Sequence, residues 1–311
     1  MANGDAREGF LEGCRNCGSI ATKDVGPVGV VAPFILKRVF NLETGFAPSG
    51  HPLKRILRRM AVFNQAADRI FGKLVLLDIQ TCTTCSFVQT KVPLPEEGIA
   101  KLYVDYRSDS YNRERIHYEP AYASIANRVG ADPQEVISRQ DTLNSWLSSK
   151  LDVGDDFSML DYGGADGKFL PALPGRKYVF EISDIAPIAG VERIVDEASL
   201  ETYSYIQLAH VLEHVPFPLE LTRQACSYLR PKGYFYVELP QDLSDEQIAQ
   251  FSNGNGNTAV TIHEHINYYT KTSAAKLLES AGLCVIDVQS TDINLGWTKA
   301  RIIRALGRKS D

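Results

Sequence analysis

A glycine-rich turn directly follows an apolar run over residues 159–169. Residues 159–162 predict a buried strand that ends near Asp161, and Gly163, Gly164 and Gly167 predict a turn that leads into a helix. Glycines carry no Cβ and tolerate positive φ, so such a turn lets the backbone come close to a bound nucleoside-like cofactor. The sequence therefore predicts a strand–turn–helix unit with a ligand site at its turn.

A second acidic residue lies at the matching place in the next predicted strand. Residues 178–180 form a β-rich run, and Glu181 follows it, eighteen residues after Gly163. At the end of the second strand of a βαβ unit, a carboxylate can accept two hydrogen bonds from the vicinal hydroxyls of a ribose. A dinucleotide-binding oxidoreductase is the competing interpretation, but the glycine spacing does not match Gly-x-Gly-x-x-Gly. A turn without a ligand does not account for Glu181.

These residues resemble the first motif and acidic partner of the class I S-adenosylmethionine-dependent methyltransferases, with Ala165 in place of the middle glycine. Residues 205–215 resemble strand four and the start of the next helix, and residues 229–240 resemble the turn into strand five. The resemblance implies a doubly wound, Rossmann-like α/β domain that binds S-adenosylmethionine. It also implies a set of cofactor-binding residues, namely Asp161, Gly163, Gly164, Ala165, Gly167, Glu181, Asp196 and His210.

Four of the six cysteines form two pairs, Cys14-x-x-Cys17 and Cys82-x-x-Cys85. Two such pairs can place four thiolates tetrahedrally around Zn²⁺ with no open position, so we expect a structural zinc site. Unligated cysteines or a redox pair are the alternatives, although paired cysteines in a reducing compartment are more often metal ligands. Residues 18–81 separate the two pairs and predict an insert within the site.

Inside this insert, residues 51–60 predict an amphipathic helix with a basic face. A solvated face is the simpler interpretation. The more specific interpretation is a basic patch that binds phosphate or a membrane surface. Four basic residues near the other end of the sequence could extend that patch, namely Arg301, Arg304, Arg308 and Lys309.

The composition is that of a soluble globular protein, and its net charge of −5 gives no overall reason to expect nucleic acid as a partner. No apolar run approaches the length of a membrane span. Residues 1–5 lack the basic-then-apolar order of a signal peptide, so we expect a cytoplasmic protein with reduced thiols. Cys226 and Cys284 lie in apolar patterns and are expected in the core.

The order of the segments along the chain points to one group of enzymes within this class. A four-cysteine module, a tyrosine-rich link over residues 102–111 and the methyltransferase-like domain follow one another as in the nucleotide-sugar C-methyltransferases, which act on 4-keto deoxysugars. Residues 263–269 are similar to the His-Glu-His-x-x-Tyr-Tyr motif that those enzymes carry after strand five. The resemblance implies a nucleotide-linked sugar, another small molecule or a glycan as substrate.

Methyl transfer to carbon requires loss of a proton α to a ketone, and transfer to oxygen requires loss of the hydroxyl proton. A histidine with a near-neutral pKa suits both tasks, and a carboxylate can orient it. The resemblance implies that His265 is the base with Glu264 as its partner. It places His214 near the reacting atoms and Tyr106 or Tyr111 at the sugar or an enolate oxygen. A strand-to-helix boundary with structural histidines is the alternative.

Two features differ from the sugar enzymes. Ile262 replaces their tyrosine before the His-Glu-His motif, and the sequence ends at Asp311, soon after a predicted strand at 284–288, where those enzymes continue with a second α/β domain. We therefore expect the cysteine module, the insert and residues 240–265 to build the substrate pocket. Residues 253–257, rich in Asn and Gly, are expected to form a lid.

Two domains are predicted, a zinc-binding module with a long helical insert over residues 1–105 and a methyltransferase domain over residues 106–311. The expected reaction transfers a methyl group from S-adenosylmethionine to carbon or oxygen of a sugar or sugar-derived group, with a His/Glu general base. One alternative is a small-molecule O- or N-methyltransferase that does not act on sugars. The other is a zinc-dependent nucleic-acid-binding or adaptor protein without turnover.

Overall fold

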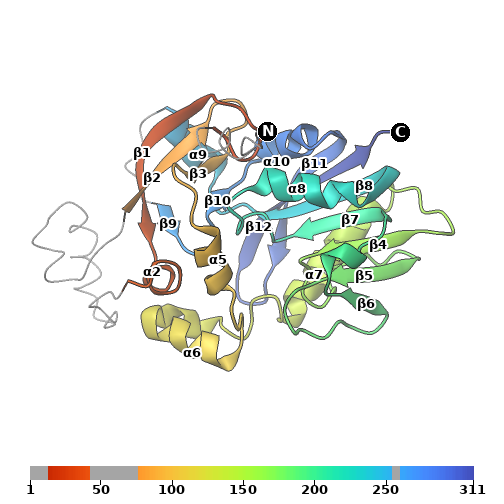
Figure 1. The fold of residues 1–311 in the computed structure, drawn as a ribbon, viewed down its shortest axis with the longest axis horizontal. Helices are drawn as coiled ribbons and strands as arrows, with labels where there is room; N and C mark the ends of the chain where they lie inside the picture. Colours follow the sequence, from red (N-terminus) through yellow and green to blue (C-terminus); the bar gives the residue numbers. More distant parts are fainter. Residues whose placement is uncertain (1–12, 43–75, 254–259) are drawn as a thin grey trace, which may run out of the picture.

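The computed structural model describes residues 13–42, 76–253 and 260–311. Two sheets organise this part of the chain: a smaller one at the left of Figure 1 and a larger one at the right. The basic helix expected at residues 51–60 lies outside the described residues. The lid expected at residues 253–257 also does, except for Asn253.

The larger sheet has seven strands in the order β11-β12-β8-β7-β4-β5-β6. Strands β4 to β8 pair in parallel, whereas β12 runs antiparallel between β8 and β11. This arrangement confirms the predicted Rossmann-like α/β fold, in which ligands bind at the carboxyl ends of the parallel strands. The strands are β4 Ser158–Tyr162, β5 Arg176–Phe180, β6 Val191–Ile194, β7 Tyr203–Ala209, β8 Leu229–Pro240, β11 Leu283–Asn294 and β12 Lys299–Lys309.

Helices cover both faces of the larger sheet. Because side chains alternate along a strand, Leu160 of β4 packs with the face that holds α8 (Pro218–Ser227) and α10 (Lys271–Ser280), while Met159 packs with α7 (Pro133–Leu147). Figure 1 shows α8 and α10 along one side of the sheet. None of the helices in the described ranges has the length and apolarity needed to cross a bilayer.

The helix expected after the glycine turn does not form. Residues 163–175 contain only turns and bends between β4 and β5. Pro171 and Pro174 explain the difference, because proline lacks a backbone N–H donor and its ring clashes with the preceding helical turn. The expectation for Cys284 is also wrong: Cys226 is buried, but Cys284 is exposed on β11.

The smaller sheet combines strands from distant parts of the chain, in the order β10-β3-β2-β1-β9. They are β1 Thr22–Val31, β2 Leu76–Cys82, β3 Val88–Thr90, β9 Val260–Ile262 and β10 Asn267–Tyr268. Only residues 263–266 join β9 to β10, although these strands form opposite edges of the sheet. The short link and a direct contact between β9 and β10 show that the sheet curls until its edges are near each other. The Tyr268 hydroxyl donates to the carbonyl of Thr261 across this gap, at 3.0 Å.

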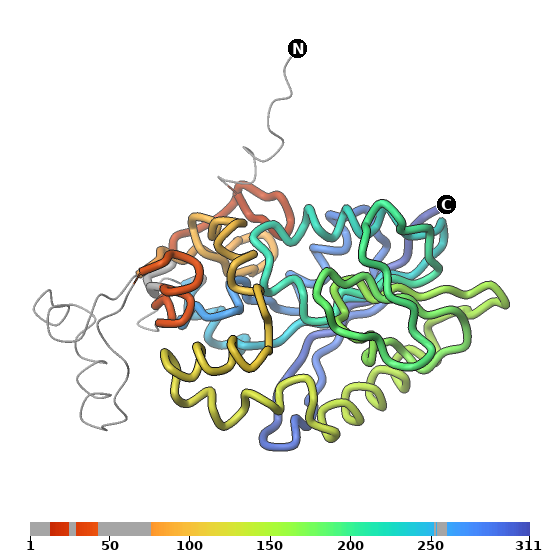
Figure 2. The backbone as a smooth tube through the Cα atoms, turned by 60° about the horizontal axis from the view of Figure 1, so that its bottom comes forward, coloured from red at the N-terminus to blue at the C-terminus, as the bar shows by residue number. Residues whose placement is uncertain are grey.

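Among the described residues, the helices that accompany the smaller sheet include α2 Pro33–Phe40, α5 Glu96–Leu102 and α6 Asp109–Tyr118. Figure 2 shows how the chain from α5 onward passes below the sheet and leads to α7 of the larger one. A further helix, α9 (Asp245–Ser252), follows β8 and contributes Ile248 and Phe251 to the core of the smaller sheet. The described chain thus crosses between the two sheets more than once.

The two cysteine pairs meet in the structure and dock on the larger sheet's helices. The Sγ atoms of Cys14 and Cys85 are 3.7 Å apart, as are those of Cys17 and Cys82. Between the first two cysteines, the Asn16 amide donates to the carbonyl of Ser273 in α10 at 2.9 Å. The domain boundary at residue 105 stays a prediction. The smaller sheet takes strands from both sides of it, since β9 and β10 come from later residues.

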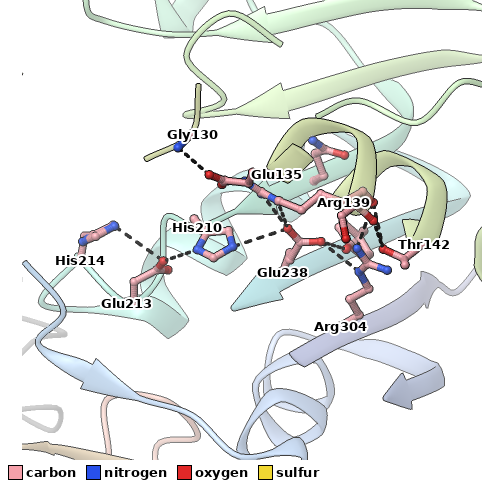
Figure 3. Close-up of polar contacts among 12 residues, drawn as sticks. Gly130, Glu135, Arg139, Thr142, His210, Glu213, His214, Glu238 and Arg304 are labelled. Atoms are coloured by element: carbon pink, nitrogen blue, oxygen red, sulfur yellow. Dashed lines mark hydrogen bonds and ion pairs between the residues drawn. The ribbon is translucent and has the colours of Figure 1, made fainter. Parts of the chain in front are cut away.

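A buried ion cluster ties α7 to the larger sheet (Figure 3). The Glu238 carboxylate of β8 accepts hydrogen bonds from Arg139 Nε at 2.8 Å, Arg304 Nε at 2.9 Å and the Tyr236 hydroxyl at 2.7 Å. Arg304 also donates to the carbonyl of Arg139. Arg304 is fully buried, so its expected place in a basic surface patch is wrong. These contacts lock α7 onto β8 and β12.

Replacing Arg304 by methionine should destabilise the protein by roughly 1–3 kcal/mol, because the buried Glu238 loses one of its two arginine partners and the carbonyl of Arg139 loses a donor. Chemical denaturation measures this change. Arg301→Met is the matched control on the same strand, since Arg301 pairs with Asp292 at the surface, where both side chains are 58% exposed. The control should unfold like the parent protein, and equal effects of both substitutions would contradict the assigned role of the cluster.

Candidate active site

The residues expected to bind the cofactor lie along one edge of the larger sheet, where its parallel strands end. The glycine turn follows β4, Glu181 follows β5, and Asp196 lies two residues after β6. His210 follows β7 directly. The fold thus brings these side chains to the edge where open α/β sheets bind ligands.

The glycine turn and Glu181 contact each other. Gly163, Ala165 and Gly167 all have positive φ, at 76°, 54° and 75°. The Ala165 N–H donates to Glu181 Oε2 at 3.0 Å, and the Ser183 N–H donates to Oε1 at 2.8 Å. Each carboxylate oxygen can accept a further hydrogen bond. The half-buried carboxylate is therefore oriented by the backbone and still able to accept from a diol.

Asp161 lies beneath this turn rather than on its surface. The residue is 1% exposed, and neither carboxylate oxygen has a hydrogen-bond partner within the described residues. A Cβ on Gly164 would come within 1.9 Å of the Asp161 carboxyl carbon, so only glycine fits there. Burial raises the pKa of Asp161 to about 7. Asp196, by contrast, is exposed and caps the backbone N–H of Ala198 at 3.0 Å.

A second group of expected residues gathers between the two sheets, where His214 and His265 come together with ring centroids 5.0 Å apart. His214 Nδ1 is 3.0 Å from the carbonyl oxygen of Glu264, which can only accept, so this nitrogen carries the proton. His265 Nδ1 is 2.7 Å from Asp242 Oδ2. Burial lowers the pKa of His214, whereas Asp242 raises that of His265 despite the opposing effect of burial.

Glu264 does not contact the His265 ring as expected. Its Oε1 accepts from the Tyr111 hydroxyl at 2.6 Å and from Arg115 Nη1 at 2.5 Å. Burial alone would raise the pKa of Glu264, but the charge of Arg115 and the Tyr111 hydrogen bond lower it to about 2. Glu264 is thus a permanently charged anchor that fixes Tyr111 and Arg115 of α6.

Three tyrosines of the link segment form a wall beside the histidines. The ring centroids of Tyr103 and Tyr106 are 5.1 Å apart, those of Tyr106 and Tyr111 are 5.3 Å apart, and Tyr103 is 5.7 Å from His214. Burial raises the pKa of Tyr106 to about 12, so its hydroxyl stays protonated. The buried Tyr103 hydroxyl has no hydrogen-bond partner within the described part of the chain. The wall therefore contains one hydroxyl without a partner, on a ring that lies next to the His214 ring.

His210 links this group to the ion cluster of α7 (Figure 3). Its Nδ1 is 3.1 Å from Glu213 Oε1, and its Nε2 is 3.5 Å from Glu238 Oε1. Burial and the charge of Arg139 lower the pKa of His210, but the two carboxylates outweigh them and raise it to about 9. Burial alone would raise the pKa of the fully buried Glu213, but the interaction with His214 and the hydrogen bond and charge of His210 lower it to about 2.

Sequence reasoning missed four residues of this group, namely Tyr103, Arg115, Glu213 and Asp242. Asp242 could have been found, because it comes two residues after the end of β8, at the carboxyl edge of the parallel strands. Arg115 lies on a helix of low amphipathicity, and nothing in its neighbourhood in the sequence points to Glu264.

Solved structures with similar folds include methyltransferases. One is 1,6-didemethyltoxoflavin-N1-methyltransferase from Burkholderia thailandensis, whose structure holds S-adenosylhomocysteine. The match has a TM-score of 0.45 and 16% identity, and it covers 72% of this chain and 96% of that one. Another, from Thermotoga maritima, is described as a possible histamine N-methyltransferase, with a TM-score of 0.42, 16% identity and coverage of 62% and 96%.

Sequence comparison finds a relative and a family. The C-methyltransferase NovU of Streptomyces niveus is 25% identical in an alignment 185 residues long that covers 54% of this chain. This chain thus spans 42% of the length of that relative. The family described as "Methyltransferase domain" matches residues 113–288, more than half of the chain, including the glycine turn, Glu181 and the His-Glu-His motif. The chain therefore belongs to the class I S-adenosylmethionine-dependent methyltransferases.

Proposed function

We propose that this methyltransferase acts on a sugar or a sugar-derived small molecule and methylates it on carbon or oxygen. The convergence of His214, His265 and the tyrosine wall is the observation that carries the proposal, because it sets a proton acceptor and hydroxyl donors side by side. The similarity to a C-methyltransferase supports transfer to carbon. Transfer to a hydroxyl needs the same base, so the two reactions share one site.

The cofactor would be held at the carboxyl edge of the larger sheet. When bound, S-adenosylmethionine supplies an electrophilic methyl group on a positively charged sulfur. The Glu181 carboxylate would accept from the ribose hydroxyls, and the turn at Gly163 and Gly167 would allow the backbone to approach. His210, directly after β7, lies between this edge and the histidine group and is fixed by Glu213 and Glu238.

In the substrate half of the site, His265 would remove the proton. With Nδ1–H donated to Asp242, its Nε2 carries the lone pair of the neutral ring. A hydroxyl that donates to the developing oxyanion would stabilise an enolate. Tyr103 suits this role better than Tyr111, whose hydroxyl is already bonded to Glu264. Glu264 would act through Tyr111 and Arg115 by fixing the wall.

The four cysteines would hold a structural zinc ion. A tetrahedron with metal–sulfur bonds of ~2.3 Å has sulfur–sulfur edges of about 3.8 Å. The two Sγ–Sγ distances of 3.7 Å fit this value. The four sulfur atoms lie within 4.8 Å of one another, so the donor set and its spacing both fit zinc. The ion would clamp the loop before β1 to the β2–β3 turn.

Replacing Glu181 by alanine should weaken S-adenosylmethionine binding at least ~10-fold, since two hydrogen bonds to a charged acceptor are lost. Isothermal titration calorimetry measures the affinity, and circular dichroism checks the fold. Glu192→Ala removes an exposed carboxylate from the neighbouring strand β6 and should bind normally. If the Glu181 variant binds S-adenosylmethionine as tightly as the parent protein, the proposed ribose contact is wrong.

Incubation in deuterated water with a panel of nucleotide-linked 4-keto deoxysugars tests the base. Deuterium should appear beside the ketone without cofactor, and a methyl group should appear with it, both detected by mass spectrometry. His265→Asn should slow both changes by ~100-fold or more. His117→Asn, at an exposed position of α6, is the control. Cofactor binding without either change on any sugar would redirect the proposal to a hydroxyl of another substrate.

The purified protein should contain one zinc ion per chain by elemental analysis. Cys85→Ser should lose the zinc and lower the melting temperature by more than about 5 °C, because metal binding contributes directly to folding. Cys284→Ser, at an exposed thiol, should keep both unchanged. A strong chelator that leaves thermal stability intact would rule out a structural metal here.

A further inference from the structure

Asp242 and His265 form a carboxylate–imidazole pair from two separate parts of the chain. Asp242 follows β8 of the larger sheet, whereas His265 belongs to the four residues that link β9 to β10. Their side chains are 29% and 20% exposed, with Asp242 Oδ2 and His265 Nδ1 2.7 Å apart. This distance is typical of a charge-assisted hydrogen bond. The pair is therefore partly exposed to solvent, at the edge of the histidine group formed by His214, His263 and His265.

The hydrogen bond selects one form of the neutral ring. An ionised carboxylate only accepts, so His265 Nδ1 must carry its proton and Nε2 must be the free acceptor. Without this bond, the ring could hold its proton on either nitrogen. Loss of the orienting carboxylate allows the unproductive tautomer, as other histidine bases show.

We propose that Asp242 is the positioning residue of the base, holding His265 in the tautomer whose Nε2 accepts the substrate proton. This inference rests on the proposed function, in which His265 removes that proton. Asp242 acts through His265 and need not touch the substrate. It takes the place that sequence reasoning gave to Glu264, whose carboxylate faces Tyr111 and Arg115 instead.

A comparison within the histidine group supports this assignment. His214 Nδ1 bonds a backbone carbonyl while its Nε2 is 3.6 Å from Glu213, and His263 Nδ1 accepts from the His265 N–H at 3.3 Å. Burial lowers the pKa of both, that of His263 to about 4. His265, the member of the three with a carboxylate on Nδ1, has a raised pKa.

The other ionisable groups around His265 do not replace Asp242. They are Glu213 and His214 after β7, and His263 and Glu264 beside His265 in the chain. Glu213 is already bonded to His210 at 3.1 Å, and Glu264 to Arg115. Both carboxylates favour the charged imidazole only through space, whereas Asp242 also bonds the ring.

The test uses Asp242→Asn, which keeps the shape and an acceptor oxygen but removes the charge. Asp245→Asn is the matched control, since Asp245 begins α9 three residues later and bonds the Gln241 amide. Nitrogen-detected NMR of the histidine rings gives the pKa and tautomer of His265 without any substrate, with its signal identified by its loss in His265→Asn. The pKa should lie above 6.5 in the parent and the control, and should fall in Asp242→Asn.

The pH profile of kcat/KM tests the role in the reaction. A base works when neutral, so activity should rise with pH through the pKa of His265. In Asp242→Asn this rise should move to lower pH, because removing the carboxylate lowers that pKa. The plateau should fall at least ~10-fold, because the ring is less basic and less well oriented. Asp242→Glu should restore part of the plateau.

The outcomes separate the two proposals. A His265 pKa that does not change in Asp242→Asn overturns the pairing, whatever the activity. If kcat/KM of Asp242→Asn falls at high pH but its rise with pH stays at the same pH as in the parent, the positioning role is overturned, because a purely structural defect gives that result. Full activity of His265→Asn contradicts the proposed base itself, which is a separate failure.

Discussion

The four-residue link between β9 and β10 is the constraint on which the site depends. β9 pairs in parallel with β1, and β10 pairs antiparallel with β3, so both ends of the link are bonded to strands from the first third of the chain. A link this short leaves little freedom to the His-Glu-His motif it contains. The backbone N–H of Ile266 also donates to the Glu213 carbonyl at 2.9 Å, which joins the link to the larger sheet. The histidines therefore gather because two sheets hold the link.

The buried charges near the site are also connected to one another. Glu238 and Glu213 are buried carboxylates on either side of His210, and each also faces a second positive or polar group. Burying an unpaired carboxylate would be very unfavourable, so the His210 imidazolium helps to make the burial of Glu213 tolerable, whereas Glu238 is also paired with Arg139 and Arg304. The bridge joins the cluster that packs α7 to the carboxylate beside His214. Packing and the proposed chemistry thus share one network of charges.

Much of the fold could be predicted because its signals are local. The glycine turn, the acidic residues after β5 and β6, and the apolar strands all lie within short windows, and their order matched that of a known fold. The missing helix after the turn was predictable in principle from Pro171 and Pro174. The pairing of Asp242 with His265 was not, although the place of Asp242 after β8 marks it as a possible site residue, because residues 23 positions apart, each in an irregular segment, carry no periodic signal. A neighbour in sequence, Glu264, was chosen where a neighbour in space, Asp242, makes the contact.

The pairing of β1 with β9 also has a consequence for how the chain is made. Gly29 pairs with Val260, so the first strand of the smaller sheet cannot complete its pairing until more than two hundred further residues have been synthesised. Contacts between residues so distant in sequence form slowly, and an unpaired strand edge is prone to aggregation while it waits. The cysteine loop next to β1 closes with β2 and β3 much earlier. A metal clamp there would hold an early hairpin together and keep its open edge ready for the strand that arrives last.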